Sequence, residues 1–406
     1  MFFETHDYKV EKKAFEDNLL IVLTFLFASY ICDMAGIYVH IPFCRQRCTY
    51  CDFHFSTTFS SYRFDMVKAI CTEIEVRKND LAGKQLQTIY FGGGTPSLLS
   101  EDELVLILDT IHANVEVTPN AEVTLEANPD DITQEQLEVW KQHGVNRLSI
   151  GIQSFRKQDL EWMNRAHSVG EAMNCIQLAQ SAGFDNLTVD LMYGLPDLST
   201  EEWEEQILTV VNNGVRHISA YCLTIEEKTA LHHWVKSGRL TTPDEDVQSE
   251  QFMQLLKTLE AHGYEQYEVS NFAKPGSRAV HNSNYWKGEW YLGIGPSAHS
   301  FNGTSRRWNV SNNITYIKGI QSGNHAFEIE ELSTENQFNE RLLTGLRTVY
   351  GVEREQLRSI REFPDDFESR LEQLKDAGWI TDENGWIYTT KEGKLRADYI
   401  ASELFC

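Results

Sequence analysis

Apolar and polar residues recur along the chain with two periods, and from residue 36 onward these periods predict strands and helices in alternation. Short runs of β-branched and aromatic residues predict strands, and longer segments with apolar residues spaced near 3.6 predict amphipathic helices. Ser100 and Ser199 or Thr200 are suitable helix N-caps. The predicted strands are Ile37–Ile41, Gln87–Phe91, Ala121–Glu126, Asn146–Ile150, Asn186–Met192 and His217–Leu223, and the predicted helices are Tyr62–Val76, Glu101–Ile111, Thr133–His143, Val169–Ala182 and Thr200–Val211.

This alternation predicts an α/β fold built from βαβ units around a parallel sheet. Most of the predicted strands end on residues that can do chemistry, which is typical of the mouth of a βα barrel. A doubly wound open sheet has the same pattern, so the periodicity leaves both architectures open.

The chain downstream of residue 225 is organised differently. We predict a less regular connecting segment over residues 226–325, with one clear helix over Glu245–His262. The pattern over residues 326–406 predicts a domain of helices and a hairpin that is winged-helix-like. This segment is not basic enough to indicate DNA binding. Its predicted elements are helices Thr334–Thr348, Asp365–Ala377 and Thr390–Leu404, and a hairpin that turns at Glu383-Asn-Gly385.

Residues 1–33 form an N-terminal extension that the periodicity does not connect to the fold. The apolar run from Asn18 to Ile31 is shorter than the roughly 20 residues that a transmembrane helix needs. Our hypothesis is that Met34 is the native start and that the domain organisation begins there, with a barrel over residues 34–225. N-terminal sequencing of the native protein tests this hypothesis.

Composition and charge narrow the class of protein. The 406 residues are 41% hydrophobic and carry a formal net charge of −24. The length suits two or three domains, and the acidic balance argues against a nucleic-acid surface. Three of the eight cysteines lie close together and the others are scattered, so we expect a reducing, cytoplasmic environment and no disulfide framework.

The three clustered cysteines are Cys44, Cys48 and Cys51, spaced C-x3-C-x2-C directly after the first predicted strand. A loop this short brings three thiolates into one small volume, and thiolates suit zinc or an iron–sulfur cluster. A zinc loop would need a fourth ligand, for which His40 or His54 is available. On a four-iron cluster, three cysteines would leave one iron open.

The spacing C-x3-C-x2-C resembles the radical S-adenosylmethionine (SAM) superfamily. Its fuller form, Tyr38-Val-His-Ile-Pro-Phe-Cys44, is similar to the branch of oxygen-independent coproporphyrinogen III oxidases and HemW-type heme chaperones. The resemblance extends over about residues 36–400. It implies a partial (β/α)6 barrel, a 4Fe-4S cluster on the three cysteines, and SAM on the open iron. A reduced cluster of this kind can pass one electron to the sulfonium of SAM and break a carbon–sulfur bond.

The resemblance also implies a set of SAM-binding residues. The glycine run at residues 92–94 matches the GGGTP motif of this branch, although on its own it is equally a plain strand-to-helix turn. The other positions, taken singly, are ordinary polar or aromatic loop residues. Together, the residues implied to bind SAM are Tyr38, Tyr50, Gly93, Gly94, Thr95, Glu126, Gln153, Arg165 and Asp190.

A second motif, His281-Asn-Ser-Asn-Tyr285-Trp286, resembles the HNxxYW motif of the heme chaperones. By itself it is a loop histidine beside two aromatic residues. The resemblance implies that His281, Tyr285 and Trp286 bind heme, for which imidazole is a common axial ligand. It implies heme and a heme-accepting protein as partners, with membrane association only through the acceptor.

The oxidases of this branch carry a further cysteine two residues after the third, and Phe53 stands at that position here. This difference favours the heme chaperones and leaves enzymatic activity open. The alternative is an oxygen-independent coproporphyrinogen III oxidase of porphyrin biosynthesis. A third possibility is a zinc-binding scaffold without radical chemistry.

Overall fold

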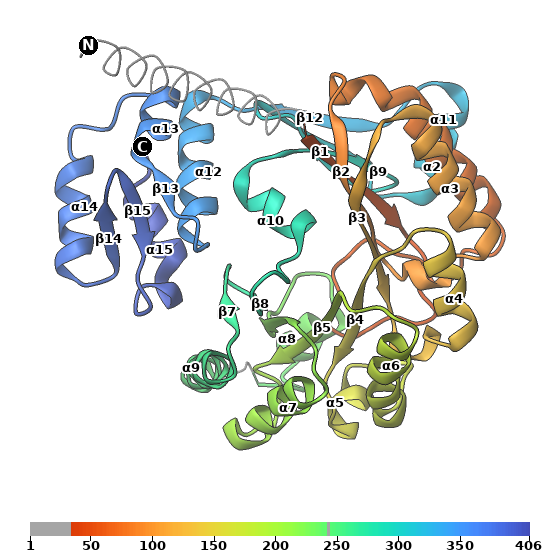
Figure 1. Cartoon of the computed structure of the whole chain (residues 1–406), viewed down its shortest axis with the longest axis horizontal. Coiled ribbons are helices and arrows are strands. Elements are labelled where there is room, and N and C mark those ends of the chain that lie inside the picture. The colour runs from red at the N-terminus through yellow and green to blue at the C-terminus, as the bar shows by residue number, and fades with distance from the viewer. Residues whose placement is uncertain (1–33, 242–243) are drawn as a thin grey trace, which may run out of the picture.

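The structure is a computed structural model that describes residues 34–241 and 244–406 (Figure 1). All six predicted parallel strands and the five helices between them are confirmed, and the largest difference in a strand start is at β3, which begins at Val117 rather than Ala121. The strands are β1 (Met34–Ile41), β2 (Gln85–Gly93), β3 (Val117–Ala127), β4 (Arg147–Gln153), β5 (Leu187–Tyr193) and β6 (His217–Cys222). The helices among them are α2 (Arg63–Arg77), α3 (Glu101–Asn114), α4 (Gln134–Gln142), α5 (Lys157–Trp162, not predicted), α6 (Val169–Ser181) and α7 (Thr200–Asn212), with short 3-10 turns at η1 (Lys78–Leu81), η2 (Pro96–Leu98) and η3 (Pro129–Asp131).

The order of the strands distinguishes the two architectures. Strands β1 to β6 lie side by side in chain order and all run parallel. A doubly wound sheet has a point where the strand order reverses, and these six strands have none. The helices cover the outer side of the curved sheet (Figure 1). The fold is therefore a partial βα barrel.

Side chains at the helix starts explain where the helices begin. Ser100, Ser168 and Ser199 each accept a hydrogen bond from the backbone three residues on, and the glutamate there bonds back to the serine amide. Such capping boxes satisfy two donors that a helix start leaves free. The N-cap predictions at Ser100 and Ser199 are confirmed.

Residues 226–325 are more regular than we predicted, because their strands extend both edges of the barrel sheet. Strand β9 pairs in parallel with β1, and β8 pairs antiparallel with β6. With these additions and one further strand after residue 325, the sheet has twelve strands in the described part of the chain. The elements are α8 (Ala230–Lys236), α9 (Glu245–Ala261), β7 (Glu265–Gln266), β8 (Asn271–Ala273), α10 (Val280–Lys287), β9 (Trp290–Ile294), β10 (His299–Phe301), β11 (Ser305–Asn309) and α11 (Asn313–Ser322).

A buried ion pair fixes the added edge strands to the barrel. Arg77 on α2 contacts Glu73 at 2.9 Å and also donates to the Gly293 carbonyl at 2.8 Å and to the Ser300 hydroxyl at 3.0 Å. A buried charge is tolerated only when it is paired and hydrogen-bonded. Sequence periodicity does not show such a network, which explains why the extension of the sheet was not predicted.

The C-terminal unit has its own hydrophobic core and lies beside the barrel (Figure 1). The predicted hairpin is confirmed: Asn384 and Gly385 both have positive φ, which is typical of a two-residue type I′ turn. The elements from residue 326 on are β12 (Phe327–Glu331), α12 (Thr334–Leu346), β13 (Val352–Glu353), α13 (Arg354–Ile360), α14 (Phe367–Asp376), β14 (Ile380–Glu383), β15 (Trp386–Thr389), η4 (Lys394–Arg396) and α15 (Ala397–Glu403).

Two boundaries of this unit differ from the periodic pattern. The last helix begins at Ala397 rather than Thr390, because Gly393 donates its amide to the Thr390 carbonyl and closes a turn. Strand β12 pairs with β11 of the large sheet, so the pairing favours a domain boundary near Ser333 over one at residue 325.

The hypothesis about Met34 and the extension over residues 1–33 lies outside the described residues. In the part of the chain that is described, no helix has the length and apolar character needed to cross a membrane.

Candidate functional site

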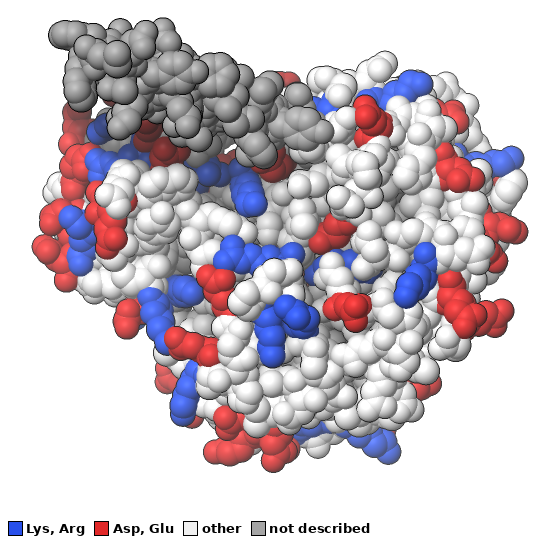
Figure 2. All heavy atoms as spheres, in the orientation of Figure 1, with Lys and Arg blue, Asp and Glu red and all other residues white. Residues whose placement is uncertain are grey.

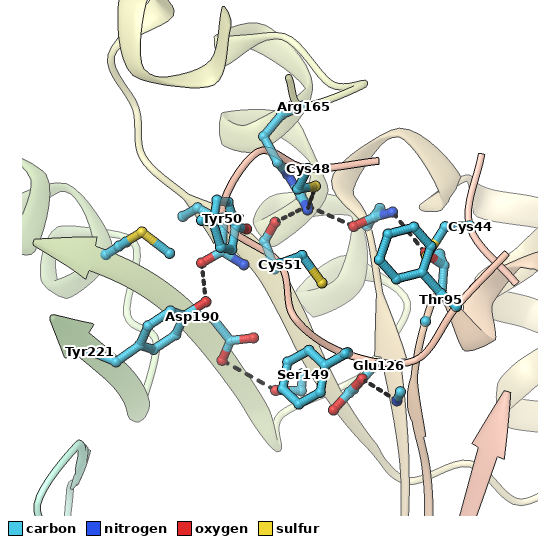
Figure 3. Close-up of a pocket in the computed structure, with 18 of the residues that line it drawn as sticks. Cys44, Cys48, Tyr50, Cys51, Thr95, Glu126, Ser149, Arg165, Asp190 and Tyr221 are labelled. Carbon is cyan, nitrogen blue, oxygen red and sulfur yellow. Dashed lines mark hydrogen bonds between the residues drawn. The ribbon is translucent and has the colours of Figure 1, made fainter. Parts of the chain in front are cut away.

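The carboxyl ends of the parallel strands open into a cavity of about 450 Å³ (Figure 3). The residues predicted to bind the cluster and SAM come from separate loops and strands, and the fold brings nearly all of them to this one place. Those that line the cavity are Cys44, Cys48, Tyr50, Cys51, Gly93, Gly94, Thr95, Glu126, Gln153, Arg165 and Asp190.

Tyr38 is the exception among the predicted SAM contacts. It is absent from the cavity lining and stacks on Tyr90, which does line the cavity, with 5.9 Å between ring centroids. Its hydroxyl lies 3.2 Å from Nδ1 of His40. Its role as a SAM contact stays a prediction.

The cysteine loop between β1 and α2 is held by its backbone. The Cys44 amide donates to the Ser56 carbonyl at 3.1 Å, and the Ser56 amide donates back to the Pro42 carbonyl at 2.9 Å. Further along, the Thr49 amide donates to the Met163 carbonyl at 3.1 Å. These bonds satisfy backbone groups that a loop would otherwise leave to water, and they turn the three cysteines toward the cavity.

The thiols already have hydrogen-bond donors beside them. The Thr95 hydroxyl lies 3.4 Å from Sγ of Cys44, and Nη1 of Arg165 lies 3.5 Å from Sγ of Cys48. Burial raises the pKa of the Cys44 thiol to about 11 and that of Cys51 to about 12. Metal ligation needs thiolates, so ligation at neutral pH releases protons from these two groups.

The donor set is compatible with an iron–sulfur cluster. All three cysteines of the loop line the same cavity, and thiolates are the usual ligands of such clusters.

Neither histidine considered as a fourth zinc ligand is directed at the thiols by its hydrogen bonds. Nε2 of His40 lies 2.8 Å from the His54 carbonyl, and its other ring nitrogen lies beside Tyr38. Nε2 of His54 lies 2.7 Å from Oδ1 of Asn313. These contacts argue against the zinc loop.

Two carboxylates face the cavity across the strand ends (Figure 3). Glu126 accepts from the Tyr90 hydroxyl at 2.8 Å and from the Gly93 amide at 3.1 Å. Asp190 accepts from the Ser149 hydroxyl at 3.3 Å. Burial, and then the nearby charge of Glu126, raise the pKa of Asp190 to about 7. Two carboxylates in one cavity favour a ligand that carries positive charge or several hydroxyl donors.

Arg165 connects the cluster loop to the strand ends. Its Nη2 donates to Oδ1 of Asn128 and to the Gly151 carbonyl, each at 2.6 Å, while its Nη1 is the group beside Cys48. Its Nε is buried without a partner. A guanidinium in this position can hold an anionic group of a ligand next to the cysteines.

The glycine run is required by close packing. A Cβ on Gly93 would lie 2.4 Å from the ring of His40, and Gly93 also has a φ of +106°. A Cβ on Gly94 would lie 2.7 Å from the Ile41 carbonyl oxygen. Only glycine fits here, and its backbone is open to a ligand in the cavity.

Several cavity residues were missed by sequence reasoning, although a signal for them exists. In β4, β5 and β6, cavity residues recur at every second position, as side chains on one face of a strand must. The residues that this rule adds to the predicted set are Ser149, Thr188, Met192, Ser219 and Tyr221. Tyr90 and Asn128 also line the cavity, but they do not follow from this alternation.

The second motif lies on helix α10, between the barrel and the C-terminal unit (Figure 1). His281 is only 2% exposed, and its two ring nitrogens lie 2.7 Å from the Thr88 hydroxyl and 2.8 Å from the Tyr285 hydroxyl. Its ring stacks on Tyr90 of the first cavity. Burial lowers the pKa of His281 to about 3, so the imidazole is neutral. In this arrangement His281 holds Tyr285 in place.

Tyr285 and Trp286 line a second cavity, of about 550 Å³, between α10 and the C-terminal unit. Tyr291 and Phe301 add aromatic surface to its wall. Asn282, inside the same motif, lines both cavities. Helix α10 is therefore the partition between the two.

Phe53, which occupies the position of the oxidases' further cysteine, lines the first cavity and is 67% exposed. An exposed apolar side chain at this edge supplies no metal ligand, and it leaves apolar surface for a ligand to cover.

Comparison with known proteins identifies the relatives of this chain. The family model described as Radical SAM superfamily matches residues 38–209. The heme chaperone HemW of Bacillus subtilis (strain 168) is 35% identical over 366 residues, covering 89% of this chain and 97% of that protein. HemW of Escherichia coli (strain K12) is 38% identical over 268 residues, covering 65% of this chain and 69% of that protein.

Among solved structures, the coproporphyrinogen III oxidase (HemN) of Escherichia coli, a radical SAM enzyme, matches with a TM-score of 0.80. The match covers 93% of this chain and 92% of that chain at 21% sequence identity. It shows that the two chains share a fold over almost their whole length.

Proposed function

Because the chain belongs to the HemW heme chaperone family within the radical SAM superfamily, we propose that it binds heme and delivers it to an acceptor protein. The single observation that carries this proposal is the match to HemW over nearly the full length of both chains. The second cavity, with its aromatic wall and its place beside the motif at residues 281–286, supports it.

Membership of the radical SAM superfamily implies a 4Fe-4S cluster and SAM. We assign the cluster to Cys44, Cys48 and Cys51, because they are the three thiols of one loop that line the first cavity. SAM would occupy the rest of that cavity, where Glu126 and Asp190 accept hydrogen bonds and Gly93 exposes its backbone. Arg165 would hold the anionic end of the ligand beside the cluster.

Heme would occupy the second cavity, against Tyr285 and Trp286. Flat aromatic rings offer a porphyrin apolar contact, and burying that surface supplies most of the binding energy. His281 would act through Tyr285, whose hydroxyl it contacts. Direct ligation of iron by His281 would first require that contact to break. We also propose that the protein works in the cytoplasm, and the seven described cysteines are free thiols, as a reducing compartment permits.

Titration of the purified protein with hemin tests the proposal. We expect a shift of the Soret absorption band that saturates, and a weaker shift for Trp286→Ala and for His281→Ala. Trp386→Ala is the matched control, because Trp386 lies in the C-terminal hairpin and outside the second cavity. No shift for the unaltered protein would contradict heme binding.

The rival function is anaerobic oxidation of coproporphyrinogen III, which the shared fold with HemN permits. We expect no protoporphyrinogen when the reconstituted protein is incubated anaerobically with coproporphyrinogen, SAM and a reductant, because Phe53 replaces the oxidases' cysteine. HemN serves as the positive control. If the protein formed more protoporphyrinogen than a Cys48→Ser variant does, the oxidase function would be supported instead.

A further inference from the structure

Arg341 on α12 lies in the wall of the second cavity without a carboxylate partner. Its Nη1 donates to the Lys287 carbonyl at 3.0 Å, and its Nε is buried with no partner. Among the described residues it takes part in no ion pair within 4 Å. A partly buried guanidinium left in this state has unused capacity to bind an anion.

The lining of the second cavity is basic, although the protein is acidic. The chain as a whole has a net charge of −24, yet the cavity is lined by Lys287, Arg306 and Arg341 against one acid, Glu340. Glu340 contacts Arg306 at 3.0 Å, and the two carboxylates whose charges act on Arg341, Glu289 and Glu353, lie outside the lining and form no ion pair with it within 4 Å. Figure 2 shows Lys and Arg side chains where the C-terminal unit faces the barrel.

Aromatic and aliphatic side chains form much of the rest of the wall. Tyr285 packs edge-on against Tyr291, with ring centroids 4.6 Å apart, and Trp286, Phe301 and Ile360 add to this apolar surface. The polar side chains in the lining are Asn271, Asn282, Gln337, Thr344 and Gln356. Such a cavity suits a ligand with a wide apolar face and an anionic edge. A small inorganic anion would leave the aromatic wall uncovered.

We propose that Arg341 is the carboxylate-binding residue of the second cavity, and that it selects a flat, largely apolar ligand by an acidic substituent. This inference rests on the proposed function, under which the ligand is heme and the acidic groups are its propionates. It adds a specificity residue outside the motif at residues 281–286.

The experiment compares hemin with hemin dimethyl ester, in which both propionates are blocked, by absorption titration in one detergent buffer. The unaltered full-length protein is expected to bind hemin about tenfold or more tightly than the ester, as expected for one charge-assisted hydrogen bond. Arg341→Gln should lose this preference, while its affinity for the ester stays unchanged. The ratio of the two affinities does not depend on the fraction of the variant that is folded.

Arg358→Gln is the matched control, because Arg358 is exposed, lies on the neighbouring helix α13 and is outside the cavity lining. It makes the same change in net charge and should keep the preference for hemin. If Arg341→Gln keeps the preference as well, the inference about Arg341 is wrong and heme binding stands. If neither hemin nor the ester binds the unaltered protein, the proposed function itself fails.

Discussion

A Cys48→Ser variant is expected to lose the iron–sulfur cluster almost completely after anaerobic reconstitution. Cys48 lies in the middle of the cysteine loop, and a serine hydroxyl is a far weaker ligand for iron than a thiolate. Iron and sulfide content and the visible absorption of the cluster measure the loss. Because SAM would bind the open iron, SAM affinity should fall with the iron content. Cys44→Ser and Cys51→Ser should behave in the same way.

Cys222→Ser is the informative control. Cys222 also lines the first cavity, but it lies at the end of β6 and outside the loop. We expect this variant to keep its iron. If it lost the cluster as fully as Cys48→Ser, Cys222 would be a fourth ligand, and no iron would be left open for SAM.

An Asp190→Asn variant is expected to be more stable than the unaltered protein at pH 8 and to gain this advantage progressively between about pH 4 and pH 7. Burial raises the pKa of Asp190 to about 7 in the folded state. In the unfolded chain it is about 3.9. Below about pH 4, Asp190 is protonated in both the folded and the unfolded protein, and its burial carries no charge penalty. As the pH rises toward 7, the unfolded chain loses this proton more readily than the folded protein, so the free energy of unfolding falls.

The size of this effect follows from the difference in pKa. Three pKa units correspond to up to about 4 kcal/mol in the free energy of unfolding. Asparagine does not titrate, so the difference between variant and unaltered protein isolates Asp190. Chemical denaturation of the cluster-free protein at several pH values measures it. The exposed Asp109→Asn serves as the control. If the free energy of unfolding changed with pH in the same way for Asp190→Asn and for the unaltered protein, the raised pKa of Asp190 would be contradicted.

The same substitution should weaken SAM binding, by about tenfold if one charge-assisted hydrogen bond is lost. Stability and binding are therefore expected to change in opposite directions. A buried carboxylate that destabilises the empty cavity is typical of a group kept for its ligand.

The sequence by itself determined the barrel strands, the cysteine loop and the main cavity residues. Strand and helix periods reflect which face of each element is buried, and this is a local property. The C-x3-C-x2-C spacing and the glycine run are local as well. These local patterns therefore predicted part of the site without any knowledge of contacts between distant segments.

Only the tertiary structure decided the sequential strand order, the extension of the sheet by residues 226–325 and the environment of His281. The sheet extension depends on the buried network around Arg77, which joins residues more than 200 positions apart. From the sequence alone, His281 cannot be distinguished from a loop histidine without hydrogen bonds. In the structure, its two ring nitrogens contact the hydroxyl groups of Thr88 and Tyr285. The unpaired Arg341 likewise becomes visible only when α12 packs beside α10, because a missing partner is a property of the packed molecule and not of a segment.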